Sequence, residues 1–184
     1  VLRDESASCR VEVDDVAVAR FFIDDEPRED AAEAIARLRA MGVDVRMLTG
    51  DRIESARRVG RLVGLADEEI IAEATPDSKL EVVAGRDRRT AMVGDGINDA
   101  AALAAADLGI AMAGGTGAAI EAADVVVPPD RVTSVPDAIH LARRTLRTIR
   151  QNLFFAFFYN SIAIPAAAFG LLGTGGPLIA AGAM

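Results

Sequence analysis

"MVGDGINDAAAL" (residues 92–103) places Asp95, Asn98 and Asp99 among small residues, directly after an apolar run. The run over 89–94 predicts a buried strand that ends where these polar side chains begin. In parallel sheets, chemistry gathers in the crevice outside the carboxyl ends of the strands. The stretch therefore predicts a polar site at the end of a buried strand.

Strand-like and helix-like segments alternate over residues 1–127. Apolar, β-branched runs predict strands over residues 16–23, 43–48, 89–94, 108–112 and 124–127. Residues 28–42 and 52–64 carry apolar side chains at helical spacing, and these segments stop at Gly42 and Gly64, as helices often do. The alternation predicts βαβ units, hence a Rossmann-like α/β fold with a parallel sheet and helices on both faces.

Charge is distributed unevenly along the 184 residues. The formal net charge is −8, and no charged residue follows Arg150. The acidic first part argues against a nucleic-acid partner. Cys9 is the single cysteine, so there is no disulfide framework and no CxxC metal site, and we expect a cytosolic setting for residues 1–150. The chain lacks a starting Met and stops inside an apolar stretch, so we expect a piece of a longer protein.

The uncharged tail predicts a membrane segment. A helix is expected over about residues 131–150, and residues 152–172 follow it with 21 uncharged, mostly apolar residues. About 20 such residues cross the hydrocarbon core, and the arginines before them suit a cytoplasmic flank. Residues 173–176 would form a turn before a second, truncated span, so that 151–184 form a membrane hairpin. The alternative is a buried hairpin in a soluble core.

Three polar clusters could share one site. Asp95 and Asp99 supply carboxylates on a tight turn, which suits Mg²⁺ with its preference for one or two carboxylates, waters and phosphate. The Thr49 hydroxyl and the Gly50 N–H follow another predicted strand and could hold phosphate oxygens. Lys79 lies near a predicted helix start and would place an ammonium on the same phosphate. Together the groups favour phosphoryl transfer, which depends mainly on positioning and charge neutralisation.

The strings "MLTGD", "TPDSK" and "GDGIND" resemble motifs two, three and four of the haloacid-dehalogenase-like phosphotransferases. The longer strings "MVGDGINDAAAL", "ADLGIAM" and "EAADVVV" resemble the phosphorylation domain of P-type ATPases, the ion pumps that form an aspartyl phosphate. "RTLRTIRQNLFFAFFYN" followed by "IPAAAFGLL" is similar to the copper-transporting branch of the heavy-metal group. The resemblance implies ATP-driven export of Cu⁺, with Mg²⁺ and ATP as cofactors.

The resemblance also implies a role for each site residue. Asp95 would bind Mg²⁺, with Asn98 and Asp99 supporting it and the phosphate. Thr49 and Gly50 would bind phosphoryl oxygens, and Lys79 would neutralise them. The remaining assignments are Asp51, near the nucleotide or the hinge, and Asp25, a hinge-side acid. The expected catalytic set is thus Thr49, Gly50, Asp51, Lys79, Asn98 and Asp99, and the expected Mg²⁺ ligands are Asp95 and Asp99.

The chain departs from the pattern of the pumps. Ala101 stands where proline is usual, Gly117 where an acid or amide is usual, and "DDEPREDA" has Glu26 and Pro27 out of place. The chain contains no DKTGT string, which carries the nucleophile in the family. Residues 1–14 would then return from a missing nucleotide-binding domain, and 15–150 would form the C-terminal part of the phosphorylation domain.

The implied partners follow from that organisation. They are the nucleotide-binding, actuator and earlier membrane parts of the same polypeptide, membrane lipid and a copper chaperone, with no nucleic acid. The implied localisation is a multi-pass cell-membrane protein with residues 1–150 in the cytoplasm, and the piece itself is expected to be inactive.

Polar residues inside the uncharged tail bear on the transported ion. Tyr159 and Asn160 lie in the predicted span, where polar side chains normally face a partner or a pathway. Ordinary contacts between helices are the alternative. The resemblance implies that Tyr159, Asn160 and Met184 bind the transported Cu⁺, and a thioether is a soft ligand suited to it. The zinc and cadmium branch carries a charged residue here, so copper is favoured.

Two other classes of function remain open. A membrane-tethered haloacid-dehalogenase-like phosphatase would need an Asp-x-Asp nucleophile pair, which neither "DD" at 14–15 nor "DD" at 24–25 supplies. A non-catalytic, membrane-anchored binding module would not need the site residues that the chain retains. His140 is expected to be a surface residue, and "GGTG" (114–117) lacks the Lys-Ser/Thr of a P-loop and predicts a turn.

Overall fold

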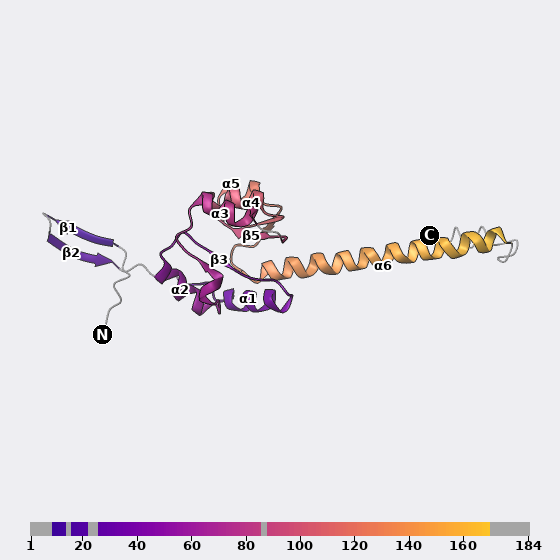
Figure 1. Cartoon of the computed structure of the whole chain (residues 1–184), viewed down its shortest axis with the longest axis horizontal. Coiled ribbons are helices and arrows are strands. Elements are labelled where there is room, and N and C mark those ends of the chain that lie inside the picture. Colours follow the sequence, from indigo (N-terminus) through magenta and orange to yellow (C-terminus); the bar gives the residue numbers. More distant parts are fainter. Residues whose placement is uncertain (1–8, 14–15, 22–25, 86–87, 170–184) are drawn as a thin grey trace. The chain divides into compact units, whose positions relative to one another are not determined.

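The computed structural model describes residues 9–13, 16–21, 26–85 and 88–169 (Figure 1). Strands and helices alternate from β3 onward, which confirms the α/β class. In chain order the elements are β1 (Cys9–Val13), β2 (Val16–Phe21), α1 (Ala31–Ala40), β3 (Met47–Leu48), α2 (Ile53–Leu62), the 3₁₀ turn η1 (Asp67–Glu69), β4 (Ile70–Ile71), α3 (Pro76–Ala84), β5 (Ala91–Gly94), the 3₁₀ turn η2 (Ile97–Asp99), α4 (Ala100–Ala105), β6 (Leu108–Met112), α5 (Gly117–Ala122), β7 (Val125–Val127) and α6 (Ser134–Ala168).

The strands after β2 pair in parallel, as the sequence predicts. β3 pairs with β4, and β6 lies between β5 and β7. The strand predicted over residues 16–23 is present as β2, but its predicted place in the parallel sheet is wrong, because β2 pairs antiparallel with β1. Only two residues separate β1 from β2, whereas a parallel connection needs a dozen or more. These two strands therefore form a hairpin outside the parallel sheets.

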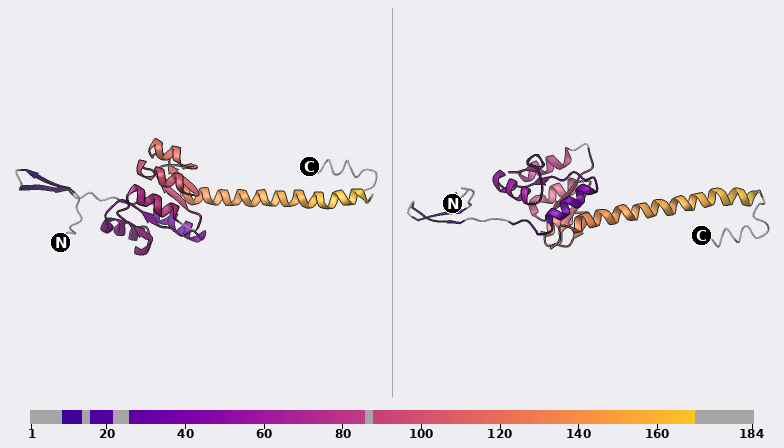
Figure 2. Two further views of the ribbon diagram at one scale, coloured as in Figure 1. Left: turned by 45° about the horizontal axis from the view of Figure 1, so that its top comes forward. Right: turned by 90° about the horizontal axis from the view of Figure 1, so that it is seen from below.

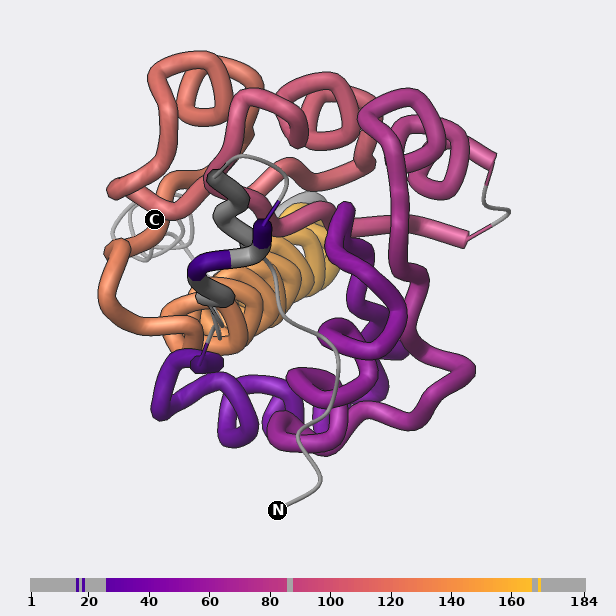
Figure 3. Tube along the Cα trace, turned by 90° about the vertical axis from the view of Figure 1, so that its left-hand side faces the viewer, coloured from indigo at the N-terminus to yellow at the C-terminus, as the bar shows by residue number. Residues whose placement is uncertain are grey.

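Helices lie on both sides of the parallel strands, as predicted (Figures 1 and 3). α4 contacts α3, α5, β5 and β6, and α1 and α2 lie on the opposite side of the strands. The core beneath α3–α5 consists of small and medium side chains: Val83, Met92, Ala102, Leu103 and Ala119. Alanine side chains let the helices pack closely against the strands, and this dense packing restrains the loops at the strand ends.

A second core forms around α2. Ala56, Val63, Leu65 and Ile70 are buried together there. β4 contributes Ile70 and is only two residues long, too short for the sequence pattern to reveal. The predicted ends of α1 and α2 are confirmed, because Gly42 and Gly64 follow the helices with φ of +75° and +82°, which glycine adopts without strain.

α6 joins two helices that the sequence predicts separately. It begins at Ser134 and runs to Ala168, with Pro165 inside it, and so combines the helix predicted over about 131–150 with most of the apolar helix predicted over 152–172 (Figure 2). Gln151 and Asn152 do not interrupt a helix, so α6 continues into the apolar residues. Within the described part of the chain, no helix is both long enough and apolar enough to span a membrane. The predicted span over 152–172 is therefore not confirmed, and the second predicted span lies outside the described residues.

The chain divides after Ala138 into two compact units, Val1–Ala138 and Ile139–Met184. This division lies inside α6. The hairpin of β1 and β2 extends across the boundary predicted between residues 14 and 15. The limits predicted for the phosphorylation domain and the membrane hairpin remain predictions.

The loop before α1 is bonded to the loop before α6. The half-buried Asp30 carboxylate accepts hydrogen bonds from the Thr133 main-chain N–H and from the Thr133 hydroxyl, each at 2.8 Å. Further along the two helices, Arg37 of α1 pairs with Asp137 of α6. The main-chain bond from Thr133 is the chief cause that lowers the pKa of Asp30 below its ordinary value, with the hydroxyl bond also contributing.

These contacts of Asp30 predict a pH-dependent contribution to the free energy of unfolding. Because the folded pKa of Asp30 is lowered, its ionised form stabilises the fold above the ordinary pKa near 3.8, and the contribution disappears as the pH falls through the folded value. We expect Asp30→Asn to reduce the free energy of unfolding by about 1 kcal/mol at pH 7, a modest value because the site is half-exposed. At pH 2 the variant and the wild type should be nearly equal.

Urea unfolding at a series of pH values measures this difference. Glu29→Gln is the matched control, because the Glu29 carboxylate makes no hydrogen bond to any residue that the structure describes. A constant difference between Asp30→Asn and wild type from pH 2 to pH 7 would contradict the assignment.

Candidate functional site

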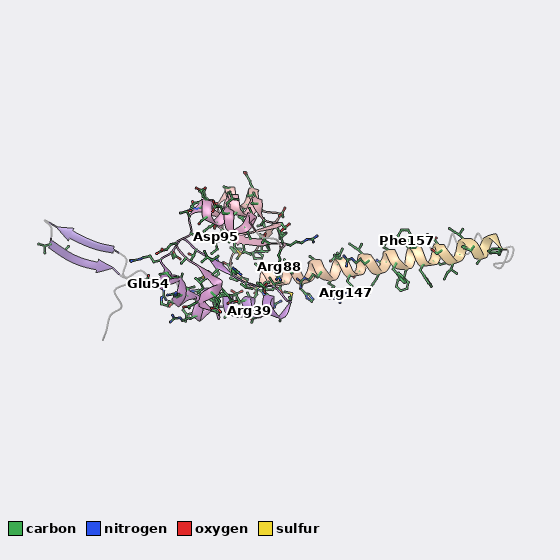
Figure 4. The ribbon with its side chains drawn as sticks, in the orientation of Figure 1. Arg39, Glu54, Arg88, Asp95, Arg147 and Phe157 are labelled. Carbon is green, nitrogen blue, oxygen red and sulfur yellow. The ribbon has the colours of Figure 1, made fainter. Side chains whose placement is uncertain are left out.

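The first part of the candidate site lies at the end of β5, where the GDGIND turn begins and Asp95 is found (Figure 4). Asp95 follows the strand directly, and Asn98 and Asp99 lie in η2, immediately before α4. A Cβ on Gly94 would come within 2.9 Å of the Asp99 Cβ, so the turn folds back tightly on the strand end. The Asp95 and Asn98 side chains are exposed and have no hydrogen-bond partner among the described residues.

Lys79 reaches this turn from α3. The Thr75 hydroxyl accepts the Ser78 N–H and caps α3, and Pro76 occupies the first helical position, which fixes where the helix begins. The Lys79 Nζ lies 2.7 Å from the Asp99 Oδ1, and the two side chains are only 13% and 14% exposed. Residues 20 positions apart in the sequence are thus in direct contact, as the predicted shared site requires.

The loop after β3 forms the second part of the site. The Thr49 hydroxyl donates to the Asp51 carboxylate at 2.8 Å and accepts the Asp51 N–H at 3.1 Å. Gly50, between them, is exposed, and a Cβ there would stand 3.4 Å from the Ala74 carbonyl. This turn holds the hydroxyl and the Gly50 main chain at the carboxyl end of the strand.

Main-chain bonds connect this loop to the start of α3. Ala74 N–H donates to the Thr49 carbonyl and Glu73 N–H donates to the Asp51 carbonyl, both at 2.9 Å. Glu73 has a φ of +54°, a left-handed conformation that a non-glycine residue adopts at some cost. The Thr49 loop therefore lies beside the residues that lead into α3, and α3 in turn places Lys79 on Asp99.

All the predicted phosphoryl-transfer residues follow carboxyl ends of β3 and β5 or lie on α3. These residues form two hydrogen-bonded pairs, Thr49 with Asp51 and Lys79 with Asp99. No hydrogen bond or ion pair joins the Thr49 loop to Asp95 in the described ranges. The two pairs are linked through the segment from Glu73 to Lys79.

The donor set suits a hard cation that keeps part of its water. Across the residues that the structure describes, no three His, Cys, Asp or Glu side chains come together as a complete ligand set. The Asp95 carboxylate has no hydrogen-bond or ion-pair partner in the described ranges, whereas one Asp99 oxygen accepts a hydrogen bond from Lys79. One free carboxylate, with waters and a phosphate completing the shell, is the arrangement Mg²⁺ commonly accepts. Mg²⁺ therefore fits at Asp95 better than at Asp99.

The residues assigned to the transported ion are placed only in part. Tyr159 and Asn160 lie on α6, where Tyr159 is half-buried and Asn160 exposed. Met184 and Asp25 lie outside the described residues. The exposed Phe157 projects from the same helix (Figure 4).

One main-chain contact at the site was not predicted from the sequence. Thr116 N–H donates to the Asp95 carbonyl at 2.9 Å, and Gly115 lies against the Asp95 main chain. Both residues belong to "GGTG" (114–117), a string that predicts only a turn. The paired glycines before a capping threonine were the available signal.

Comparisons with known proteins show the family to which the chain is related. A family model described as haloacid dehalogenase-like hydrolase matches residues 3–107, and a second model with the same description matches residues 80–139. Curated relatives include a "Probable copper-importing P-type ATPase A" of Enterococcus hirae, 48% identical over 87% of the chain, and a "Copper-exporting P-type ATPase" of Bacillus subtilis, 43% identical over 95%. The chain spans 22% and 21% of their respective lengths.

The solved structures give the same result. A zinc-transporting PIB-type ATPase in an E2.Pi state covers 91% of the chain with a TM-score of 0.76 and 35% identity, and the match spans 29% of that protein. The relatives are thus P-type ATPases that transport copper or other heavy metals, and they are much longer than this chain.

Proposed function

The chain belongs to the haloacid dehalogenase-like hydrolase family, and from this premise we propose that it forms the phosphate- and magnesium-binding part of an ATP-driven heavy-metal cation transporter. The observation that carries the proposal is the largely buried pair of Lys79 and Asp99, with Asp99 in the same turn as the Asp95 carboxylate. A cation and a carboxylate at one strand end support the proposal, because phosphoryl transfer depends on charge neutralisation and positioning.

Each residue has a role in the proposal. The Asp95 carboxylate holds Mg²⁺, and the bound ion neutralises charge on the phosphoryl oxygens. Asp99 orients Lys79 through the 2.7 Å contact, so that the ammonium faces the same oxygens without a change of rotamer. Thr49 and Gly50 bind phosphoryl oxygens from the β3 loop, Asp51 fixes the Thr49 hydroxyl, and Asn98 supports the turn.

The nucleophile in this proposal comes from a segment outside the 184 residues. The chain contains no DKTGT string. Among the described strands, β3 pairs only with β4 and β5 only with β6, so each has an open edge on its other side. A further parallel strand could add to either edge through main-chain hydrogen bonds and bring an aspartate to the strand ends where the site lies.

The chain by itself tests this part of the proposal. We expect the purified 184-residue chain to show no Mg²⁺-dependent hydrolysis of ATP or of p-nitrophenyl phosphate, because it lacks the aspartate that would be phosphorylated. The measurement is phosphate release over hours, with the full-length protein as the positive control. Steady Mg²⁺-dependent turnover by the chain would instead favour the alternative, a membrane-tethered phosphatase.

For the cargo we propose Cu⁺, with export as the direction and a copper chaperone as a partner. The support is chemical: the tail after Arg150 carries no charge, Tyr159 and Asn160 lie on α6, and a thioether such as Met184 suits a soft ion. In this proposal residues 151–184 lie in the cell membrane as a hairpin and residues 1–150 in the cytoplasm. The four arginines between residues 143 and 150 suit a cytoplasmic flank.

Asn160 gives the sharpest test of the cargo. In the full-length protein, we expect Asn160→Leu to leave phosphorylation by inorganic phosphate unchanged but to abolish its inhibition by Cu⁺, because the substitution removes an ion ligand on α6 and changes none of the residues assigned to the phosphate site. Gln151→Leu, on the same helix before the apolar stretch, is the control and should retain the inhibition. Normal inhibition of Asn160→Leu by Cu⁺ would show that Asn160 serves only in packing.

A further inference from the structure

The loop between β6 and α5, residues 113–116, has no part in the proposed chemistry, yet it contacts the site. Thr116 N–H donates to the Asp95 main-chain carbonyl at 2.9 Å. A Cβ built on Gly115 would come within 2.5 Å of the same carbonyl oxygen and 2.9 Å of the Asp95 Cα. Only glycine permits this approach of the two main chains.

The loop itself is held firmly. Gly115 N–H donates to the Met112 carbonyl and Ala113 N–H to the Val127 carbonyl, both at 2.8 Å, so the loop is bonded to β6 and β7. The Thr116 side chain accepts the Ala119 N–H and caps α5. Since β6 and α5 are packed into the core through Ala111 and Ala119, the loop is a rigid surface against which Asp95 rests.

Asp95 has few other restraints. β5 ends at Gly94, and the Asp95 carboxylate makes no hydrogen bond to any residue in the described ranges. The position of that carboxylate is therefore set by its main chain, and the main chain is held by the contact with Gly115 and Thr116.

We propose that Gly115 and Thr116 are positioning residues for Mg²⁺, which act by fixing the main chain of Asp95 at the end of β5. The inference rests on the proposed function, because it takes Asp95 as the Mg²⁺ ligand. It adds a specific claim: affinity for Mg²⁺ depends on two residues that touch neither the ion nor the phosphate.

Gly115→Ala tests the claim against Gly117→Ala. A Cβ on Gly117 meets nothing within 4 Å, so the second variant adds the same methyl group two residues away without contact. In the full-length protein we expect Gly115→Ala to raise the Mg²⁺ concentration for half-maximal phosphoenzyme formation by roughly tenfold, the lower range for supporting groups around metal ligands. The KM for ATP should stay within twofold, and Gly117→Ala should match the wild type in both.

A second pair of variants covers the case in which Gly115→Ala fails to fold. Thr116 has a φ of −70°, which proline also adopts. Thr116→Pro removes the N–H that bonds Asp95, and Thr116→Val retains it, while both lose the side-chain cap of α5. We expect only Thr116→Pro to weaken Mg²⁺ binding, measured without turnover as the Mg²⁺-dependent rise in unfolding temperature in the presence of inorganic phosphate.

The outcomes separate the two proposals. Equal Mg²⁺ dependence of Gly115→Ala and Gly117→Ala, or of Thr116→Pro and Thr116→Val, in a protein that does form the phosphoenzyme, overturns the positioning role alone. Failure of the wild type to form any Mg²⁺-dependent phosphoenzyme overturns the proposed function and this inference with it.

Discussion

Asp95→Asn in the full-length protein will lower phosphoenzyme formation from ATP by at least about 100-fold, because groups that merely support a metal ligand already contribute 10- to 100-fold. The amide retains the size and shape of the side chain but removes the negative charge that holds Mg²⁺. The fold should not change, since the Asp95 carboxylate has no hydrogen-bond partner among the residues described. The measurement is the amount of acid-stable phosphoprotein formed from labelled ATP at saturating Mg²⁺.

The control for this prediction is Asp44→Asn, the same chemical change in the loop before β3. The Asp44 side chain is 86% exposed and pairs with Arg88, 3.3 Å away. We expect it to form phosphoenzyme at the wild-type level. If Asp95→Asn also did so, Asp95 would not be the Mg²⁺ ligand, and the metal would have to be held elsewhere.

Lys79→Met will destabilise the 184-residue chain by about 3 kcal/mol, the low end of the range for removing one partner of a buried ion pair, since both side chains retain slight exposure. Methionine fills similar volume but leaves the Asp99 carboxylate without its cation. Urea unfolding at pH 7 measures the effect as a shift of the midpoint. The destabilisation is a separate effect from the loss of phosphoryl transfer that the same variant should show in the full-length protein.

Two comparisons make the Lys79 result specific. Adding Asp99→Asn to Lys79→Met should recover more than half of the lost stability, because the second change removes the stranded charge. Arg88→Met is the surface control: Arg88 and Asp44 are 87% and 86% exposed, so its loss should change stability by less than about 0.5 kcal/mol. A Lys79→Met effect no larger than that of Arg88→Met would mean that the pair is solvated in solution.

Local pattern accounts for most of the fold that could be predicted. The strands β5, β6 and β7 can be predicted because each is an apolar run. The helices α1 and α2 can be predicted because their apolar residues have helical spacing and a glycine, Gly42 or Gly64, follows each helix. β4 is two residues long and has none. The pairing of β2 with β1 depends on the short distance between them along the chain, which the run of apolar residues in β2 does not reveal. The continuity of α6 was not predicted, because the change of composition after Arg150 was interpreted as a boundary between two helices.

The positions of the candidate site residues at strand ends and a helix start could be predicted from the sequence, but their contacts could not. Each of Thr49, Lys79 and Asp95 could be selected because it follows a strand or begins a helix, where parallel sheets place chemistry. The bond between Lys79 and Asp99 depends on how α3 packs on α4, which no local pattern encodes. The same holds for Thr116 and Asp95, joined through the packing of α5 against η2.

The edges of β3 and β5 that have no strand partner among the described residues have a practical consequence for handling the chain in solution. Unpaired main-chain N–H and C=O groups attract strands of other molecules, and β5 also exposes Val93. At the concentrations used for crystals or NMR, we expect purified chains to add to one another edge to edge and to precipitate. A short peptide that occupies one of these edges would act as a solubilising cap, and co-expression would be the simplest way to supply it.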